Sequence, residues 1–196
     1  MHFQLPQPRL LTHGDEDTGT NSVRICLREK GVEYVEQPVP RGHAITYAPN
    51  GRVPVLVDID RERSAVAGVL AILQYIEMYY SSGPWLMPSP VDERARYARA
   101  LGRLQDAGGD VAGELAAWER YVDGGEGFMV GGDISLVDIA VYPVLEKLRK
   151  EGREMGAVLT AYLERMRERN SVKTVYKLES AEEKTVVEAT AKSEVE

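Results

Sequence analysis

A proline interrupts a run of aliphatic residues at positions 51–57, whose sequence is GRVPVLV. Proline has no backbone N–H to donate to a neighbouring strand, so it belongs at the first residue of a strand, at an edge or at a bulge. A peptide bond before proline is also the one place where a cis bond costs only about 0.5–1 kcal/mol. A cis bond between Val53 and Pro54 would turn the backbone N–H and C=O of Val53 outward. The sequence therefore predicts a strand after this proline and, before it, a turn whose backbone can pair with an extended peptide ligand.

The length and the charge of the chain exclude several classes of protein. Its 196 residues suffice for one large domain or two small ones. Lysine and arginine number 24 against 31 acidic residues, a net charge of −7, and no basic stripe carries interleaved aromatic residues, so we expect no nucleic-acid partner. The apolar runs are too interrupted by charges to span a bilayer, so we expect no membrane partner. Cys26 is the single cysteine and no secretory signal is present, so we expect a soluble cytoplasmic protein.

Strand and helix patterns alternate over the first 80 residues, which predicts a small α/β unit. Gly31 is a natural stop for the first helix, and Cys26 lies on the apolar face of that helix, where a buried thiol is expected. In chain order the predicted elements are a strand at 9–12, a helix from Thr20 or Asn21 to Lys30, a strand at 32–39, a strand after Pro54 and a helix at 65–80.

The rest of the chain has a helical rhythm. Residues 81–84, with the sequence SSGP, break the earlier pattern, and Ser135 with Asp138 fits a capping box at the start of a helix. Helices are predicted at 93–104, 111–122, 136–151 and 159–169. We therefore divide the chain into an α/β half at 1–80, a linker at 81–90, a helical half at 91–179 and an acidic tail at 180–196, frayed or disordered.

Three segments together give a specific resemblance. Residues 21–34 (NSVRICLREKGVEY), 48–56 (APNGRVPVL) and 132–140 (GDISLVDIA) resemble the first helix, the cis-proline segment and a helix-opening capping box of the soluble glutathione S-transferase family. With residues 70–77 (LAILQYIE), the similarity extends over residues 9–175. The first of these segments is similar in phrasing to the zeta-like members, which include maleylacetoacetate isomerases.

The resemblance implies a fold, a cofactor and an assembly. The fold class is an α/β thioredoxin-like N-terminal half plus an all-α C-terminal half, and family members are usually homodimers. The first half would bind glutathione and the second would supply a pocket for a hydrophobic co-substrate. Matched residue by residue, Val53 takes the place whose backbone pairs with the cysteinyl part of glutathione, and Pro54 matches the cis proline. Arg52 beside them, and His43 in the preceding segment, complete this part of the predicted glutathione site.

The match to the family breaks where the γ-glutamyl group would be held. The family usually has an acid or amide followed by serine there, and this chain has Gly68 and Val69. The N–H groups at a helix N-terminus still bind a carboxylate, and the turn at 60–64 is a second source of polar groups. Glutathione binding that is retained but weaker, and no binding at all, are both open from the sequence.

The residue that activates the glutathione thiol is also undecided by the sequence. A hydroxyl near the start of the first helix, aided by the helix dipole, would stabilise the thiolate. Counting back six residues from Val23, to the place that the family uses, gives Asp17, whose carboxylate would repel a thiolate. Ser22 and Thr20 are the leading candidates and Thr18 follows, with Asn21 or no residue as the remaining possibilities. Each hydroxyl also has an ordinary structural role: Ser22 as a first-turn residue, Thr20 as a helix cap and Thr18 as a loop residue.

The co-substrate side is predicted from position alone. His13 ends the first strand, and Arg94, Tyr97 and Leu101 share one face of a predicted helix, so these four are the candidates for a co-substrate pocket, with simple packing as the alternative. The three histidines lack metal-ligand spacing, so we expect no metal site.

Two functions follow from these residues. The first is a glutathione S-transferase-like enzyme whose glutathione thiolate attacks an electrophilic, unsaturated, hydrophobic small molecule. The adduct is either released as a conjugate or resolved as a cis–trans isomer, and the divergent γ-glutamyl site favours a specialised biosynthetic role over general detoxification. The alternative is a catalytically silent module that uses the same fold for dimerisation or binding.

Overall fold

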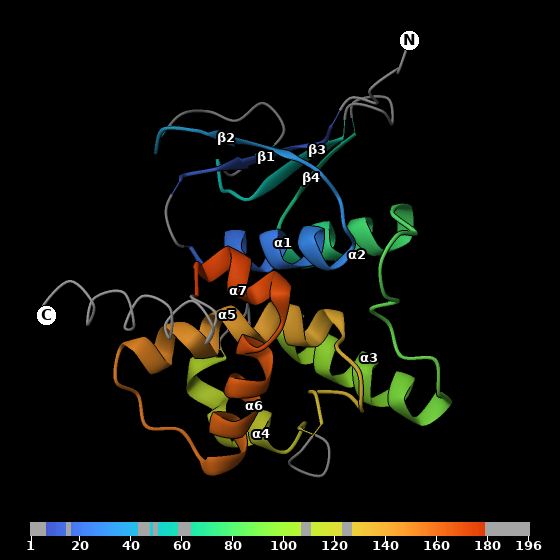
Figure 1. The fold of residues 1–196 in the computed structure, drawn as a ribbon, viewed down its shortest axis with the longest axis vertical. Coiled ribbons are helices and arrows are strands. Elements are labelled where there is room, and N and C mark those ends of the chain that lie inside the picture. The colour runs from blue at the N-terminus through green and yellow to red at the C-terminus, as the bar shows by residue number, and fades with distance from the viewer. Residues whose placement is uncertain are drawn as a thin grey trace, which may run out of the picture.

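The computed structural model describes residues 7–14, 17–42, 48, 51–58, 64–106, 111–122 and 127–178. A four-stranded sheet lies over two helices, and the remaining helices form a second layer beneath them (Figure 1). The elements of the first half are β1 (Arg9–Thr12), α1 (Thr18–Glu29), β2 (Val35–Pro38), β3 (Val55–Asp58), β4 (Ser64–Ala67) and α2 (Val69–Tyr79). Those of the second half are α3 (Val91–Asp106), η1 (Ala112–Glu114), α4 (Leu115–Glu119), α5 (Leu136–Lys150), α6 (Ala157–Arg167) and α7 (Asn170–Tyr176).

The sheet has the strand order β2-β1-β3-β4. β1 runs parallel to β2 and antiparallel to β3, and β3 runs antiparallel to β4. This mixed sheet with its two covering helices, followed by an all-helical half, confirms the predicted fold class.

The predicted helix at 65–80 is wrong at its start. Residues 64–67 form β4, in which Val66 pairs with Leu56 of β3, and α2 begins only at Val69. Gly68 separates the two elements with a φ of 93°, a left-handed conformation that glycine adopts without steric cost. Small and β-branched residues fit either pattern locally, and pairing with β3 decided between them.

The first helix also begins earlier than predicted. Its N-cap is Asp17, whose carboxylate accepts hydrogen bonds from the backbone N–H groups of Gly19 and Thr20, at 3.1 and 2.8 Å. The expected caps, Thr20 and Asn21, lie inside the helix instead. The predicted stop is confirmed, because Gly31 has a φ of 62° and the helix end is closed by backbone bonds from Gly31 and Val32 back to the last turn.

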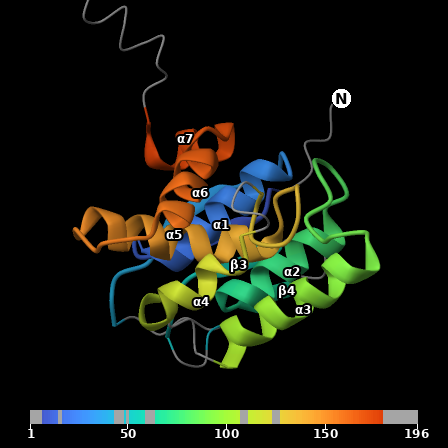
Figure 2. The same ribbon diagram turned by 90° about the horizontal axis from the view of Figure 1, so that it is seen from below.

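The helical half packs around α5, which lies against α1 (Figures 1 and 2). The capping box is confirmed: the fully buried Asp138 carboxylate accepts hydrogen bonds from the N–H and Oγ of Ser135 at 2.8 and 2.7 Å. It also accepts one from the N–H of Met129 at 2.7 Å, so the same side chain holds the preceding loop. The helix predicted at 111–122 is split into η1 and α4, and the one predicted at 159–169 is two helices, α6 and α7.

A buried ion pair holds the linker against the α/β half. The Nζ of Lys30, at the end of α1, lies 3.0 Å from Oε2 of Glu77 on α2 and donates a 3.0 Å hydrogen bond to the carbonyl of Pro84. The other carboxylate oxygen of Glu77 accepts from the N–H of Leu86 at 2.9 Å. Both charged side chains are about 1% exposed or less. Two helices of the first half and the chain that leaves it are thus joined by one pair of charges.

We predict that Lys30→Met lowers the free energy of unfolding by about 3–5 kcal/mol, because it leaves the Glu77 carboxylate charged and buried without a partner. Lys30→Met/Glu77→Gln should recover part of that loss, since the amide is neutral and its oxygen still accepts from Leu86. Urea unfolding of the two variants measures both effects. The control is Lys147→Met, which removes an exposed pair with Glu151 and should change the free energy by under about 0.5 kcal/mol. A loss in Lys30→Met no larger than in this control would contradict the role of the pair.

A second charged contact joins α1 to the C-terminal helices. Glu29 accepts hydrogen bonds from Nε and an Nη of Arg169, both at 2.8 Å, and another from the hydroxyl of Ser171. Burial acts to raise the pKa of the Glu29 carboxyl, but the hydrogen bonds from Arg169 and Ser171 outweigh it and hold that pKa below its ordinary value. A bidentate pair of this kind fixes orientation as well as distance.

The lowered pKa makes this contact sensitive to pH. The folded protein keeps Glu29 ionised below the unfolded pKa of about 4.3, so its contribution is complete above that value and lost as pH falls through the lower folded pKa. We predict that Arg169→Gln costs about 1–3 kcal/mol of unfolding free energy near pH 6. The difference from the wild type should shrink toward zero near pH 3, measured by urea unfolding at each pH. Lys173→Gln, which removes an exposed pair with Glu168, is the matched control, and an Arg169→Gln difference that stays constant with pH would refute the pH dependence.

Candidate functional site

A cleft of about 660 Å³ lies where the two halves meet. The N-terminal ends of α1 and α2 and the turn before β3 form its α/β side, and α3 and α5 contribute its helical side. Its lining residues are Asp17, Thr18, Gly19, Ser22, Arg52, Val53, Pro54, Gly68, Val69, Leu70, Ala71, Leu104, Gln105, Val111, Ala140 and Val144.

The proline turn forms the centre of the α/β side. The peptide bond between Val53 and Pro54 is cis, as the sequence predicted. Within the described part of the chain, the backbone N–H and C=O of Val53 have no hydrogen-bond partner. Val53 lines the cleft with the rest of the turn, so its unpaired backbone groups are candidates to bind an extended ligand.

Gly19 allows three elements to meet at this turn. A Cβ at this position would lie 2.7 Å from Cγ2 of Val69 and 3.5 Å from Cδ of Pro54. The 2.7 Å separation from Val69 is well below the contact distance of two carbon atoms, so a side chain here would push α2 away from α1. The glycine in the first turn of α1 thereby keeps the proline turn and the start of α2 on one wall of the cleft.

The start of α2 has no side-chain cap. Its N-cap, Gly68, leaves open space where a Cβ would lie, and no side chain among the described residues accepts a hydrogen bond from the first N–H groups of the helix. Helix N-terminal N–H groups without a cap bind anions, because they combine free donors with the positive end of the helix dipole. Gly68 and Val69 therefore lie in the cleft as expected and present backbone groups there in place of side chains.

The three candidate hydroxyls differ in their surroundings. The Thr20 hydroxyl is buried and donates to the Asp17 carboxylate, and Thr20 does not line the cleft. The Ser22 hydroxyl lines the cleft but is buried and donates to the backbone C=O of Thr18 at 3.1 Å. Thr18 lines the cleft and is partly exposed, and its hydroxyl has no partner among the described residues. Thr18 has the hydroxyl that can donate to a ligand without breaking another bond.

Asp17 is present in the cleft for a structural reason. Its carboxylate holds the first turn of α1 through two backbone N–H groups and the Thr20 hydroxyl. A carboxylate at a helix N-terminus also offsets the positive end of the helix dipole. Among the described lining residues, Asp17 is the only acid and Arg52 the only base, so the cleft has little net charge.

The helical side of the cleft is apolar. Leu104 comes from α3, Val111 precedes η1, and Ala140 and Val144 come from α5; Gln105 adds one polar group. Sequence reasoning missed these residues. The helical pattern placed α3 near the cleft, but which of its turns reaches the cleft depends on how α3 packs.

The predicted co-substrate residues do not line this cleft. Nδ1 of His13 lies 3.0 Å from the carbonyl of Val39, and Arg94 is exposed on α3. Tyr97 is buried near Cys26 and Glu77, and burial, with the Glu77 charge, raises the pKa of its hydroxyl to about 12. Leu101 packs against the core. His43 lies outside the described residues.

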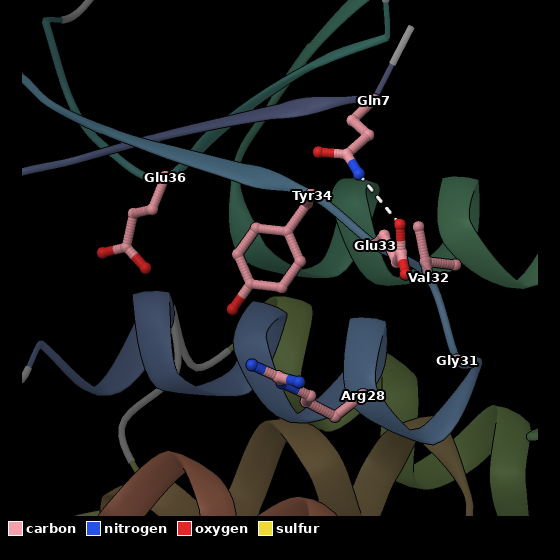
Figure 3. Close-up of a pocket in the computed structure, with 7 residues that line it drawn as sticks. All are labelled: Gln7, Arg28, Gly31, Val32, Glu33, Tyr34 and Glu36. Atoms are coloured by element: carbon pink, nitrogen blue, oxygen red, sulfur yellow. Dashed lines mark hydrogen bonds between the residues drawn. The ribbon is translucent and has the colours of Figure 1, made fainter. Parts of the chain in front are cut away.

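A second cavity, of about 550 Å³, lies between the segment before β2 and α1 (Figure 3). Both of its acidic groups have protein partners: the amide of Gln7 donates to Glu33 at 2.9 Å, and Glu36 accepts from Arg24, which lies outside the cavity. Burial raises the pKa of the Tyr34 hydroxyl, which keeps that group neutral. The proline turn and the predicted site residues lie elsewhere, so the first cleft is the stronger candidate.

The described residues contain no group of three or more histidine, cysteine, aspartate or glutamate side chains placed to bind a metal ion. None of the described helices has the length and apolar character needed to cross a membrane.

Comparison with known proteins decides the family. The sequence model of the glutathione S-transferase N-terminal domain matches residues 20–78, and that of the C-terminal domain matches residues 108–178. The chain belongs to the glutathione S-transferase family. The N-terminal match includes α1 from Thr20 onward, the proline turn and the start of α2.

Solved structures of the glutathione S-transferase fold superpose on most of the chain. A glutathione S-transferase from the Antarctic clam Laternula elliptica has a TM-score of 0.73 at 19% identity, covering 87% of this chain and 92% of its own. Ure2p, solved in complex with glutathione, has a TM-score of 0.73 at 16% identity, covering 88% and 99%. A glutathione transferase homolog from Burkholderia, with bound glutathione, has a TM-score of 0.67 at 22% identity, covering 88% and 97%. At these identities the likeness shows the fold, and no curated protein matches the chain by sequence.

Proposed function

We propose that this family member binds glutathione in the cleft and uses the thiolate of glutathione on an electrophilic, unsaturated, hydrophobic small molecule. The observation that carries the proposal is the composition of the cleft. Unpaired backbone groups of Val53 lie on one side and an apolar wall on the other, so a peptide and an apolar molecule can meet there. Two of the superposed proteins, Ure2p and the Burkholderia homolog, were solved with glutathione, which supports this choice of peptide.

Glutathione has a peptide backbone and two terminal carboxylates, and the cleft has partners for these groups. The cysteinyl N–H and C=O pair with the backbone of Val53, as in a short antiparallel ladder. The γ-glutamyl carboxylate lies at the uncapped start of α2, on the N–H groups of Val69 and Leu70. Arg52, exposed at the rim, binds a carboxylate of the ligand. Contact between His43 and the glycyl end remains a prediction.

The thiol then lies near the start of α1. We assign the activating hydrogen bond to the Thr18 hydroxyl, because the hydroxyls of Ser22 and Thr20 already donate to Thr18 O and to Asp17. A hydroxyl that donates to sulfur favours the thiolate and lowers the thiol pKa. The nearby Asp17 carboxylate acts in the opposite direction, so we expect a smaller lowering than an uncharged cleft would produce.

The reaction begins with addition of the thiolate to a conjugated carbon. A sulfur lone pair forms the S–C bond, the π electrons move onto the carbonyl oxygen of the electrophile, and the resulting enolate takes a proton if the adduct is released as a conjugate. If the adduct instead rotates about its new single bond, expulsion of the thiolate restores the double bond as the other isomer. Glutathione is consumed in the first case and returned in the second. The proposal also includes a specialised biosynthetic substrate, membership of the zeta-like group of the family and a cytoplasmic location.

Calorimetric titration with glutathione tests the binding step, and we expect a saturable signal. Incubation with a hydrophobic enone or a cis-configured conjugated dienone, with and without glutathione, tests the chemistry: a conjugate gains the mass of glutathione, and an isomer keeps its mass. If glutathione produces no binding heat and no thermal shift, the enzyme is refuted and the silent binding module remains. The absence of the family's acid–serine pair at Gly68 and Val69 is the observation that keeps this alternative in view.

Variants of the first turn provide the control for this test. Thr18→Val should lower the rate of the chemical step about tenfold to a hundredfold, the worth of a hydrogen bond to a charged group. Thr18→Ser should keep most of the rate, and Ser22→Ala should change it little because that hydroxyl is bound to backbone. Equal losses in Thr18→Val and Ser22→Ala would reject the assignment to Thr18.

We further propose that the protein is a homodimer. Large apolar side chains are exposed on α2, at Met78 (71%) and Tyr79 (45%), and at the start of α3, at Val91 (76%). Exposed apolar patches mark protein interfaces, and a dimer contact would remove these side chains from water. Light scattering coupled to size-exclusion chromatography should give the mass of two chains, and Met78→Lys/Val91→Lys should shift it to one. A single-chain mass for the wild type at micromolar concentration would contradict the dimer.

A further inference from the structure

Four arginines converge on a small cavity between α3 and α4, apart from the cleft. The cavity has a volume of about 270 Å³ and is lined by Arg96, Arg99, Arg103, Ala117, Arg120 and Tyr121. Arg96, Arg99 and Arg103 recur along one flank of α3, and Arg120 follows α4. No residue of this group lines the glutathione cleft. We call these four side chains the arginine cluster.

Two members of the arginine cluster are held in place by the protein. Arg96 donates from an Nη to the backbone C=O of Tyr121 at 3.2 Å. Arg103 donates from Nε to the carboxylate of Glu114 on η1 at 2.6 Å. These bonds tie α3 to the segment that follows it, and the two guanidinium ions place positive charge at the sides of the cavity.

The other two members lack a protein partner. Arg99 and Arg120 are exposed, and their side chains make no hydrogen bond or ion pair within the described part of the chain. Glu114 neutralises one positive charge of the cluster. Like charges brought together repel one another. The four positive charges of the cluster lie together although the protein as a whole has a net charge of −7. A bound anion would relieve the repulsion.

We propose that the arginine cluster binds the phosphate group of a small soluble molecule. The guanidinium fork matches the spacing of phosphate oxygens and donates two parallel hydrogen bonds to them. Arg99 and Arg120 supply two such forks, and the positive charges of Arg96 and Arg103 beside them favour a doubly charged group. The cavity is smaller than the roughly 300–1,000 Å³ of pockets for drug-sized ligands, which favours a short phosphate ester over a larger molecule.

Titration with inorganic phosphate and with glycerol 3-phosphate, at low ionic strength, tests the site by calorimetry. We expect saturable binding of both probes to the wild type. Arg99→Gln/Arg120→Gln should weaken it about tenfold or more, because two charge-assisted donors are lost and neither is needed to hold the fold. The matched control is Arg9→Gln/Arg153→Gln, which removes the same charge from two exposed arginines elsewhere and should leave binding unchanged. Lack of saturation, or equal weakening in both double variants, would overturn the proposal.

A second arm distinguishes a soluble phosphate from a lipid headgroup. Vesicles of phosphatidylcholine, with and without phosphatidic acid, are sedimented with the protein. We expect the protein to stay in the supernatant in both cases. Sedimentation only with phosphatidic acid, together with no binding of glycerol 3-phosphate, would overturn the soluble ligand. The glutathione titration, repeated on the cluster variants, should be unchanged, so failure at this site is separable from failure of the proposed function.

Discussion

The buried pair of Lys30 and Glu77 is the contact on which the rest of the structure depends. It joins the end of α1 to α2 and, through Pro84 and Leu86, binds the start of the linker to both. Glu29 and Arg169 bind the other end of the helical half to α1. Between these two charged contacts, one hydrophobic core runs through both halves and includes Trp118, Tyr142 and Tyr162 among its largest members. The cleft is the part of the junction that this core does not fill.

The α/β side of the cleft is made mostly of backbone. Val53 offers an unpaired peptide group, the start of α2 offers uncapped N–H groups, and Gly19 permits the close approach that brings them together. A site made this way tolerates side-chain divergence, because the donors are the same in every sequence that keeps the fold. This explains how the chain loses the family's acid–serine pair at Gly68 and Val69 and still keeps a shaped cleft. The consequence is that few side chains of the cleft can bind a ligand, and Arg52 is the only charged donor among the described lining residues.

The sequence predicted the strands and helices well where local signals agree. The 3.6-residue spacing identified α3 and α5, the Ser135–Asp138 box placed the start of α5, and Gly31 marked the end of α1. It failed where two patterns compete. Residues 64–67 carry small and β-branched side chains that fit a helix extension, and only pairing with β3 makes them a strand. At the start of α1, both Asp17 and Thr20 are good caps, and the structure uses the first and turns the second toward it.

By itself, the sequence determined the elements of this protein and the cis-proline turn, because both follow from local periodicity and from the one residue type that permits a cis bond at low cost. Only the tertiary structure decided which hydroxyl at the start of α1 has no protein partner and which turn of α3 lines the cleft. Thr18, Thr20 and Ser22 lie within the first five residues of α1, and what separates them is whether Asp17 or a carbonyl already accepts from their hydroxyls. The same holds for Leu104 and Gln105, which enter the cleft in place of the turn of Tyr97 and Leu101. Such choices depend on contacts between segments far apart in the chain, which no local pattern contains.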